Sequence, residues 1–261
     1  MSQKIIHLHR HLEKLGSCAV AFSGGQDSAF LLYHAFEVLR ERLLAVTISA
    51  PYTIKSDLAE AKRVTERVGI LQVCIDMPLL ETLRYNPENR CYLCKRRTFE
   101  LIRVAASAHG FVHILDGTNV DDLSDYRPGA EALRELAIES PLAASGITKG
   151  DIRQWLAGRG DLLSKKMPNS CLMTRMPAGH EVTDEELRRI EKAEAYLTAQ
   201  GLSPVRVRSD GKTARIEVDR EDRQRFYNED FINAVSMTLK GYGYRYVSLD
   251  LDGYIMGNMN G

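Results

Sequence analysis

The stretch CAVAFSGGQDSAF, residues 18–30, decides the fold. Its opening apolar run is stopped by Gly24 and Gly25, which predicts a short strand buried on both faces. Residues 27–40 place apolar side chains at helical spacing, so a helix is expected directly after the glycines. A buried strand, a glycine-rich turn and a helix together favour an α/β protein with a parallel sheet.

The following sequence repeats this alternation. Strand patterns are predicted at residues 43–49, 71–76 and 112–116, and helix patterns at 56–68 and about 94–108. Strands that alternate with helices form right-handed βαβ units, and such sheets bind ligands at the carboxyl ends of their strands.

The pattern changes after about residue 178. A helix over residues 184–200, capped by Thr183, is followed by two short strands around an Asp210-Gly211 turn, another long helix and a last strand. We therefore expect an α/β domain over residues 1–178 and a smaller α+β domain over residues 179–261.

Composition narrows the functional classes. The 261 residues are 44% hydrophobic and 27% charged, as in ordinary globular proteins, and 35 Lys+Arg balance 35 Asp+Glu. Proteins that coat nucleic acid usually carry excess positive charge, so nucleic acid is not an expected partner. No stretch approaches the roughly 20 apolar residues of a membrane span, and the first residues do not form a signal peptide. We expect a cytoplasmic protein without a membrane partner.

Residues 23–28, SGGQDS, have the chemistry of a phosphate-binding loop. Glycines at a helix N-terminus let backbone amides converge on an anion, and the helix dipole adds positive potential. Ser23 and Ser28 can donate from their hydroxyls, while Asp27 can hold Mg²⁺ or cap the helix. The alternative is an ordinary turn between strand and helix. The loop matches neither the Walker A motif nor the dinucleotide fingerprint.

This loop, with Ser23, Gly24, Gly25, Asp27 and Ser28, resembles the PP-loop of the ATP pyrophosphatases. The resemblance implies an adenine nucleotide alpha hydrolase-like domain with ATP and Mg²⁺ as cofactors. It also implies cleavage of ATP between the α and β phosphates, with AMP attached to an oxygen of the substrate and Asp27 among the catalytic residues.

Four further segments resemble the LarE family of sulfur transferases: RCYLCK (90–95), ILDGTNVDDLSDYRPG (114–129), SKKMPNSCLMTRMPAG (164–179) and VRVRSDGKTARIEV (205–218). The resemblance implies a homo-oligomer that adenylates a carboxylate of pyridinium-3,5-biscarboxylic acid mononucleotide and converts it to a thiocarboxylate. That reaction would serve the synthesis of the nickel-pincer nucleotide, the cofactor of lactate racemase.

The same resemblance implies that Glu194 is a substrate-side acid and that Arg206 and Arg208 bind a phosphate. Arginines two apart on a strand point to the same face and can hold one phosphate together. The alternatives are a solvated strand face and an exposed helix residue. Asp121, Asp122 and Asp125 could hold Mg²⁺ or orient Arg127, or could belong to a plain solvated loop.

Five cysteines are an odd number, which argues against a disulfide framework. Cys18 and Cys74 lie in apolar runs and are expected to be buried. Cys91, Cys94 and Cys171 lie in polar, loop-like surroundings, where a thiol is expected to have a function.

The LarE resemblance implies two possible sulfur sources. Either Cys171 gives up its own sulfur and becomes dehydroalanine, or Cys91, Cys94 and Cys171 hold a 4Fe-4S cluster that receives sulfide from a cysteine desulfurase or from free sulfide. The C-x-x-C spacing and its basic neighbours favour the cluster. A zinc site is a weaker alternative, because it lacks a fourth ligand.

Three other functions remain open from the sequence. A tRNA thiolase would share the loop and could share the cysteines, but the neutral charge disfavours it. An ammonia-dependent amidating synthetase would leave the loop cysteines without a role. A nucleotide-sensing module would bind ATP without releasing pyrophosphate.

Overall fold

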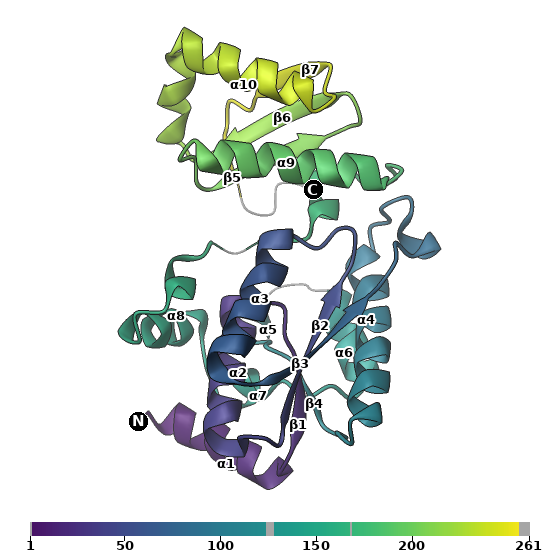
Figure 1. Cartoon of the computed structure of the whole chain (residues 1–261), viewed down its shortest axis with the longest axis vertical. Coiled ribbons are helices and arrows are strands. Elements are labelled where there is room, and N and C mark those ends of the chain that lie inside the picture. The colour runs from purple at the N-terminus through teal and green to yellow at the C-terminus, as the bar shows by residue number, and fades with distance from the viewer. Residues whose placement is uncertain (1, 124–127, 168, 256–261) are drawn as a thin grey trace. The chain divides into compact units, whose positions relative to one another are not determined.

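The computed structural model describes residues 2–123, 128–167 and 169–255, and the chain divides into two compact units (Figure 1). The first unit comprises Met1–Pro78 and Asn89–Asn169, and the second comprises Leu79–Glu88 and Ser170–Gly261. The predicted boundary at 178/179 therefore lies inside the second unit.

The first unit is built on a four-stranded sheet with the order β3-β2-β1-β4, in which every pair is parallel. The strands are β1 (Cys18–Ala21), β2 (Leu43–Ser49), β3 (Leu71–Asp76) and β4 (Ile114–Leu115). The predicted α/β class with a parallel sheet is confirmed.

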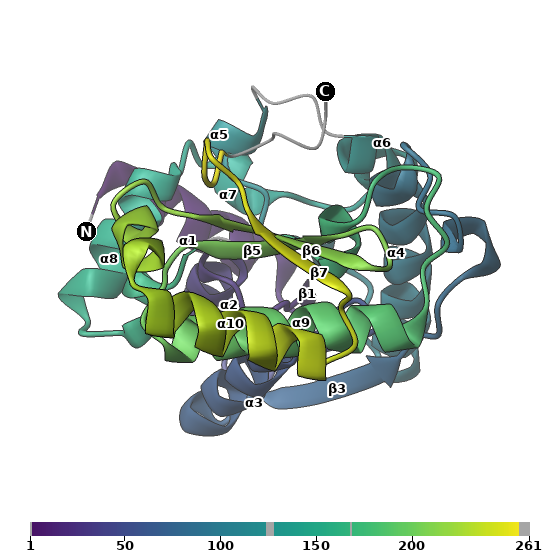
Figure 2. The same ribbon diagram turned by 90° about the horizontal axis from the view of Figure 1, so that it is seen from above.

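Helices cover both faces of this sheet, as Figures 1 and 2 show. The helices of the unit are α1 (Gln3–Leu15), α2 (Gln26–Leu39), α3 (Lys55–Val68), α4 (Arg90–Ala108), α5 (Val120–Leu123), α6 (Pro128–Glu135), α7 (Pro141–Ala144) and α8 (Lys149–Gly158), followed by the 3-10 turn η2 (Leu162–Lys165). Val20 of β1 belongs to the same core cluster as residues of α1, α2 and α8, whereas its neighbour Ala19 belongs to a cluster with residues of α4. Alternating side chains along each central strand therefore supply two separate cores.

Two expectations for the cysteines in this unit are wrong. Helix α4 begins at Arg90, before the expected start at about residue 94, so Cys91 lies in its first turn rather than in a loop and Cys94 lies at the start of the next turn. Cys74 is exposed, because β3 is the edge strand of the sheet and much of it faces solvent. Cys18 is buried at the centre of the sheet, as expected.

The second unit contains a three-stranded mixed sheet and two long helices. Its elements are β5 (Val205–Ser209), β6 (Thr213–Val218), β7 (Tyr246–Leu249), α9 (Asp184–Ala199) and α10 (Glu229–Gly241), with the 3-10 turns η1 (Glu81–Leu83), η3 (Leu172–Arg175) and η4 (Asp222–Tyr227). β5 and β6 form the predicted antiparallel hairpin, and β7 pairs with β6 in parallel. The Oγ1 of Thr183 accepts a hydrogen bond from the Glu186 amide at 3.2 Å, which confirms the predicted helix cap.

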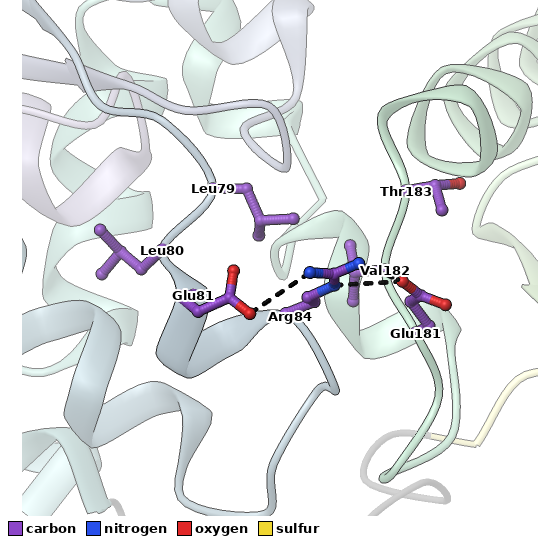
Figure 3. Close-up of a pocket in the computed structure, with 7 residues that line it drawn as sticks. All are labelled: Leu79, Leu80, Glu81, Arg84, Glu181, Val182 and Thr183. Atoms are coloured by element: carbon purple, nitrogen blue, oxygen red, sulfur yellow. Dashed lines mark hydrogen bonds and ion pairs between the residues drawn. The ribbon is translucent and has the colours of Figure 1, made fainter.

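The segment 79–88 belongs to the second unit, and hydrogen bonds from Asn86 tie it to that unit. The Nδ2 of the buried Asn86 donates to the carbonyls of Met173, Met176 and Pro177 at 2.9–3.2 Å. An open pocket lies beside this segment, and Figure 3 shows Arg84 between the carboxylates of Glu81 and Glu181. The pocket is lined by Leu79, Leu80, Glu81, Arg84, Glu181, Val182 and Thr183.

Among the described residues, the structure contains no helix with both the length and the apolar character that a membrane crossing requires.

Candidate functional site

The predicted phosphate loop connects β1 to α2 and is held in shape by close backbone packing. Gly24 adopts a φ of +75°, and a Cβ there would lie 2.3 Å from the carbonyl oxygen of Asp57 in α3. Glycine is therefore required for both conformation and space. Gly25 is the N-cap of α2. Since an α-helix leaves its first amides without intrahelical acceptors, this turn can present N–H groups to an anion.

Short polar contacts fix the two loop serines. The Ser23 and Ser28 hydroxyl oxygens lie 3.2 Å apart, and the Ser28 hydroxyl also donates to the carbonyl of Gly25. Asp27 lies in the first turn of α2, where the helix dipole favours a carboxylate. Gly117, which follows β4, packs against the same turn, because a Cβ there would lie 2.9 Å from the Ser28 amide nitrogen. Sequence reasoning did not single out Gly117.

Lys166 is a second residue that sequence reasoning missed. Its Nζ lies 2.9 Å from the carbonyl oxygen of Gly24 and 2.9 Å from Oδ1 of Asp57. The Nε2 of Gln26 donates to the carbonyls of Leu163 and Lys166, which ties this segment to the start of α2. The loop thus has a cation beside its glycines, although the motif itself contains no lysine. The pair Lys165-Lys166 is visible in the sequence, but nothing there places it at the loop.

The acidic segment after β4 is engaged with Lys149. Oδ2 of Asp121 accepts from the Lys149 amide at 2.6 Å, and Oδ1 of the buried Asp122 lies 2.9 Å from its Nζ. Asp125 and Arg127 lie outside the described residues. A magnesium role for this segment stays a prediction.

Cys91 and Cys94 lie three residues apart near the N-terminus of α4, and so project from one side of the helix. Cys91 is exposed, whereas the Sγ of Cys94 lies 3.3 Å from the Tyr52 hydroxyl. Burial raises the pKa of the Cys94 thiol, and hydrogen bonds from Tyr52 and Thr98 oppose this effect. The helix N-terminus also favours thiolates at this turn.

Three of the basic neighbours of these thiols have carboxylate partners. Nζ of Lys95 lies 3.9 Å from Asp116, and Arg96 and Arg97 both approach Glu100 at 3.4 Å. Their charge is therefore partly neutralised, so these side chains stabilise thiolates less than free cations would.

Cys171 belongs to the second unit, where it is the N-cap of η3. Its carbonyl accepts hydrogen bonds from the Thr174 hydroxyl at 2.8 Å and from Nη1 of Arg175 at 3.3 Å. The backbone of Cys171 is thus fixed by its own turn. Joint ligation of one cluster by the three cysteines stays a prediction.

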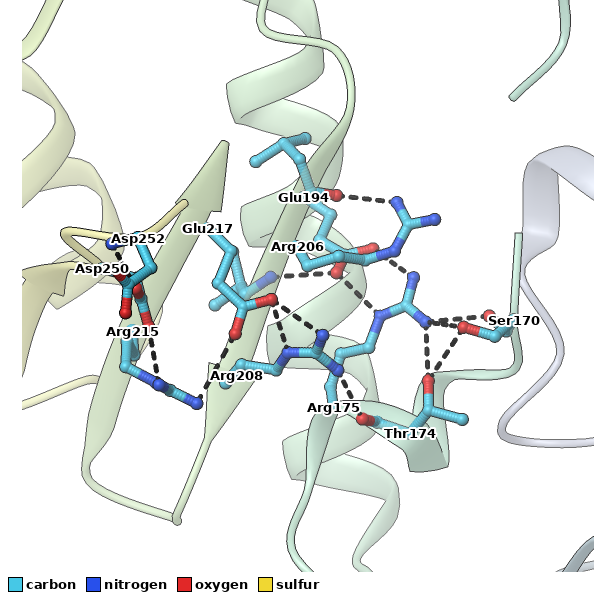
Figure 4. Close-up of polar contacts among 12 residues, drawn as sticks. Ser170, Thr174, Arg175, Glu194, Arg206, Arg208, Arg215, Glu217, Asp250 and Asp252 are labelled. Atoms are coloured by element: carbon cyan, nitrogen blue, oxygen red, sulfur yellow. Dashed lines mark hydrogen bonds and ion pairs between the residues drawn. The ribbon is translucent and has the colours of Figure 1, made fainter. Parts of the chain in front are cut away.

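Arg175 is the centre of a group that we call the arginine cluster: Arg175, Glu194, Arg206, Arg208 and Glu217 (Figure 4). Arg175 is fully buried, and its Nε and Nη2 bind the two carboxylate oxygens of Glu194 at 2.8 and 3.0 Å. Nη1 donates to the carbonyl and hydroxyl of Ser170 at 2.9 and 2.8 Å. This one side chain therefore joins helix α9 to the segment that carries Cys171. Sequence reasoning missed it.

Arg206 and Arg208 share one face of β5, since Val205 and Val207 occupy the core face. Nε and Nη2 of Arg208 bind Oε2 of the fully buried Glu217 at 2.8 and 2.7 Å.

Arg206 is held differently. Its Nη1 donates to the Val205 carbonyl at 2.8 Å, and its guanidinium lies 5.2 Å from the centre of the Tyr254 ring. The shared strand face agrees with the prediction, whereas the two side chains have different partners.

The arginine cluster combines three guanidinium groups with two carboxylates. Burial lowers the pKa of Arg206, the positive charge of Arg175 lowers it further, and Glu194 opposes the shift. A guanidinium nevertheless stays charged in proteins, so the cluster carries an excess positive charge in a poorly solvated place. Such a group is suited to bind an anion.

Comparison with known proteins identifies the family. No family model matches the chain. A protein of Lactiplantibacillus plantarum named pyridinium-3,5-bisthiocarboxylic acid mononucleotide synthase is 30% identical over 252 residues, which cover 95% of this chain and 91% of that protein. The chain belongs to the LarE family.

Other proteins resemble this LarE-family chain over its full length. An uncharacterised protein of Synechocystis sp. is 36% identical and aligns with 100% of this chain and 98% of its own length. An uncharacterised protein of Methanocaldococcus jannaschii is 29% identical, with 97% of each chain aligned. The aligned region thus spans both units.

Proposed function

We propose that this protein is an ATP-dependent sulfur transferase acting on pyridinium-3,5-biscarboxylic acid mononucleotide. It would convert a carboxylate of that molecule to a thiocarboxylate, as a step in making the nickel-pincer nucleotide of lactate racemase. Membership of the LarE family carries the proposal, because the similarity to the named synthase covers 95% of this chain. The phosphate loop and the arginine cluster support it, since they offer one place for ATP and one for a phosphorylated substrate.

In the first step, a carboxylate oxygen of the substrate attacks the α-phosphorus of ATP. The bond from that phosphorus to the bridging oxygen breaks, and pyrophosphate leaves with the bridging oxygen. The amides at the start of α2 would hold the departing phosphates, and Lys166 would stabilise their charge. Asp27 would bind Mg²⁺, which neutralises further charge as the bond breaks.

The phosphate of the mononucleotide is the ligand proposed for the arginine cluster. Arg206 and Arg208 would bind it together, because their side chains share one face of β5. Both Glu194 oxygens accept from Arg175, and Oε1 also accepts from the Val207 amide at 3.0 Å. Glu194 is therefore proposed to orient Arg175 rather than to transfer a proton.

In the second step, a sulfur nucleophile attacks the activated carbonyl carbon, and AMP leaves with the oxygen that formerly belonged to the carboxylate. The product is a thiocarboxylate, and no electron transfer is needed. When the nucleophile is sulfide brought by a donor, the thiocarboxylate forms directly. When it is the Cys171 thiolate, a thioester forms first; removal of the Cys171 Cα proton and cleavage of its Cβ–S bond then release the thiocarboxylate and leave dehydroalanine.

The residues present fit a cluster in two respects. Cys91 and Cys94 offer two thiols on one side of a helix, at its positively polarised end. With Cys171 they would hold three irons of a 4Fe-4S cluster. When bound, such a cluster supplies sulfide at the iron that lacks a protein ligand.

The experiment combines two measurements on anaerobically prepared protein. Pyrophosphate and AMP are measured with ATP alone and with ATP plus the pyridinium mononucleotide, and the product is examined by mass spectrometry. We expect pyrophosphate release that requires the second substrate, with one thiocarboxylate formed for each AMP. Pyrophosphate release that requires tRNA instead, or ADP as the product, would contradict the proposal.

Iron content and cysteine variants then separate the two sulfur sources. With a cluster, Cys91→Ala, Cys94→Ala and Cys171→Ala each lose iron and repeated turnover, whereas Cys74→Ala, which removes an exposed thiol elsewhere, behaves as the unaltered protein. With sacrificial sulfur, Cys171 alone is essential and becomes dehydroalanine after one turnover. The second result would overturn the cluster but leave the sulfur transfer intact.

A further inference from the structure

A group of metal-ligating side chains lies where helices α1 and α2 of the first unit pack together. Nε2 of His9, Nδ1 of His34 and Oε2 of Glu37 all lie within 4.8 Å of one another. His34 is in the C-terminal half of α2, whose first turn forms the phosphate loop. At 1.5 Å per residue, His34 is about 12 Å along that helix from Gln26. This group is thus separate from the loop.

The three atoms form a triangle of the size that a metal ion requires. His9 Nε2 is 2.8 Å from His34 Nδ1, which is 3.4 Å from Glu37 Oε2, and the third side measures 3.7 Å. The centre of such a triangle is about 2 Å from each corner, close to zinc–nitrogen and zinc–oxygen bond lengths of about 2.0–2.2 Å. An ion could therefore contact all three atoms with little movement of the side chains.

One hydrogen bond joins the two histidines. Its hydrogen lies between ring nitrogens 2.8 Å apart and is directed away from the Glu37 oxygen, which lies 3.4 and 3.7 Å from them. A neutral imidazole is the form that binds metal. A divalent cation would accept electron pairs from all three atoms at once.

The surroundings hold the group in place. The His34 side chain is 2% exposed, and its ring lies 4.5 Å from that of Phe30 and 4.6 Å from that of Trp155. Nη1 of Arg159 approaches the other oxygen of Glu37, Oε1, at 3.5 Å, which leaves Oε2 directed at the histidines. Because Glu37 is partly exposed, water can reach an ion on that side and complete a tetrahedral shell.

We propose that His9, His34 and Glu37 form a zinc site that fastens helix α1 to helix α2. Two imidazoles and one carboxylate are a ligand set that zinc accepts readily, and imidazole also suits cobalt and nickel. Because the ligands come from two helices, the bound ion would resist their separation and stabilise the folded protein.

Cobalt serves as the probe, because cysteines elsewhere in the chain can also bind metal. The protein is titrated with Co²⁺ and then with Zn²⁺, and its absorption and melting temperature are followed. We expect one tetrahedral cobalt whose spectrum lacks a sulfur-to-cobalt charge-transfer band, displacement of this cobalt by zinc, and a higher melting temperature with zinc. Glu37→Gln and His9→Gln should each lower the affinity for this ion by at least about 100-fold.

His7→Gln is the matched control, since His7 is an exposed residue of the same helix and should leave binding unchanged. Glu37→Gln is the decisive variant, because it alters a partly exposed side chain and keeps its shape. The site is disproved if cobalt binds only with sulfur ligation, or if folded Glu37→Gln binds the ion as tightly as the unaltered protein.

Discussion

The phosphate loop and the arginine cluster would both bind phosphate, yet they are built from different parts of the chain. The loop would bind phosphate through backbone amides. Its shape depends on Gly24 and Gly117, because glycine has no side chain and main-chain atoms of other segments pack closely against both. The cluster uses side chains, and its cations are aligned by buried carboxylates, Glu194 and Glu217. The phosphate loop is therefore expected to be sensitive to any atom added at its glycines, whereas the arginine cluster is expected to be sensitive to a change of charge.

The largest expected effect comes from Gly24→Ala. The added methyl would lie 2.3 Å from a main-chain oxygen of α3, so the loop must move, and substrate-dependent pyrophosphate release should be abolished. Gly16→Ala is the control, because Gly16 has a nearly equal φ of +74° but no atom within 4 Å of the added methyl. It should cost only the about 1–2 kcal/mol of a left-handed residue and keep its activity. Equal activity in both variants would refute the backbone account of the loop.

Arg175→Met should be the most destabilising change in the arginine cluster. It leaves the mostly buried Glu194 without its bidentate partner, at an expected cost of about 3–5 kcal/mol in the free energy of unfolding. Arg215→Met removes a half-exposed arginine that lies 2.6 Å from Asp250 and 3.5 Å from Glu217. Since Glu217 keeps its two short bonds to Arg208, this change should cost at most about 1 kcal/mol. Urea unfolding of both variants measures the difference.

Adding Glu194→Gln to Arg175→Met should recover part of the lost stability, because the unpaired charge is then removed. The contradicting result is additivity. If the two substitutions lower the free energy of unfolding by the sum of their separate effects, the two side chains do not act as a pair.

Arg206→Ala tests whether the arginine cluster and the phosphate loop bind different substrates. Loss of one charge-assisted hydrogen bond is worth about 1.5–3 kcal/mol, so the KM for the pyridinium mononucleotide should rise by about tenfold or more. The KM for ATP should change little. If ATP binding weakens equally, the arginine cluster does not serve the second substrate.

Lys166→Met should give the smallest effect and act on the other ligand. Lys166 is partly exposed and bonded to Asp57, so its loss should raise the KM for ATP by about fivefold, corresponding to about 1 kcal/mol. Lys165→Met is the matched control, because Lys165 is an exposed neighbour and should leave both KM values unchanged. A rise in the KM for the mononucleotide alone would place Lys166 at the wrong site.

The same difference explains how much the sequence could predict. The parallel α/β sheet and the loop after its strand β1 follow from local patterns, because the spacing of glycines and apolar residues determines the turn between β1 and α2. The β5–β6 hairpin of the second unit and the Thr183 helix cap also depend on residues close together in the sequence. These features were predicted correctly.

Contacts between distant residues could not be predicted in this way. Lys166 bonds to Gly24, which lies 142 residues earlier in the chain. Arg175 pairs with Glu194, although helix α9 carries several other acidic residues. The exposure of Cys74 depends on β3 being an edge strand, which a strand pattern alone does not reveal. The helical start at Arg90 was missed because Asn89 caps α4 without a side-chain hydrogen bond, so the sequence has no strong capping signal there.

Isotope transfer tests the proposed adenylation most directly. The pyridinium mononucleotide is labelled with oxygen-18 in its carboxylates and incubated with the protein, ATP and a sulfide supply, and AMP and product are examined by mass spectrometry. If the carboxylate is adenylated and then attacked by sulfur, the phosphate of AMP gains one labelled oxygen while the product exchanges one labelled oxygen for sulfur. Unlabelled AMP beside a thiocarboxylate product, or a labelled product without AMP, would contradict the proposed reaction.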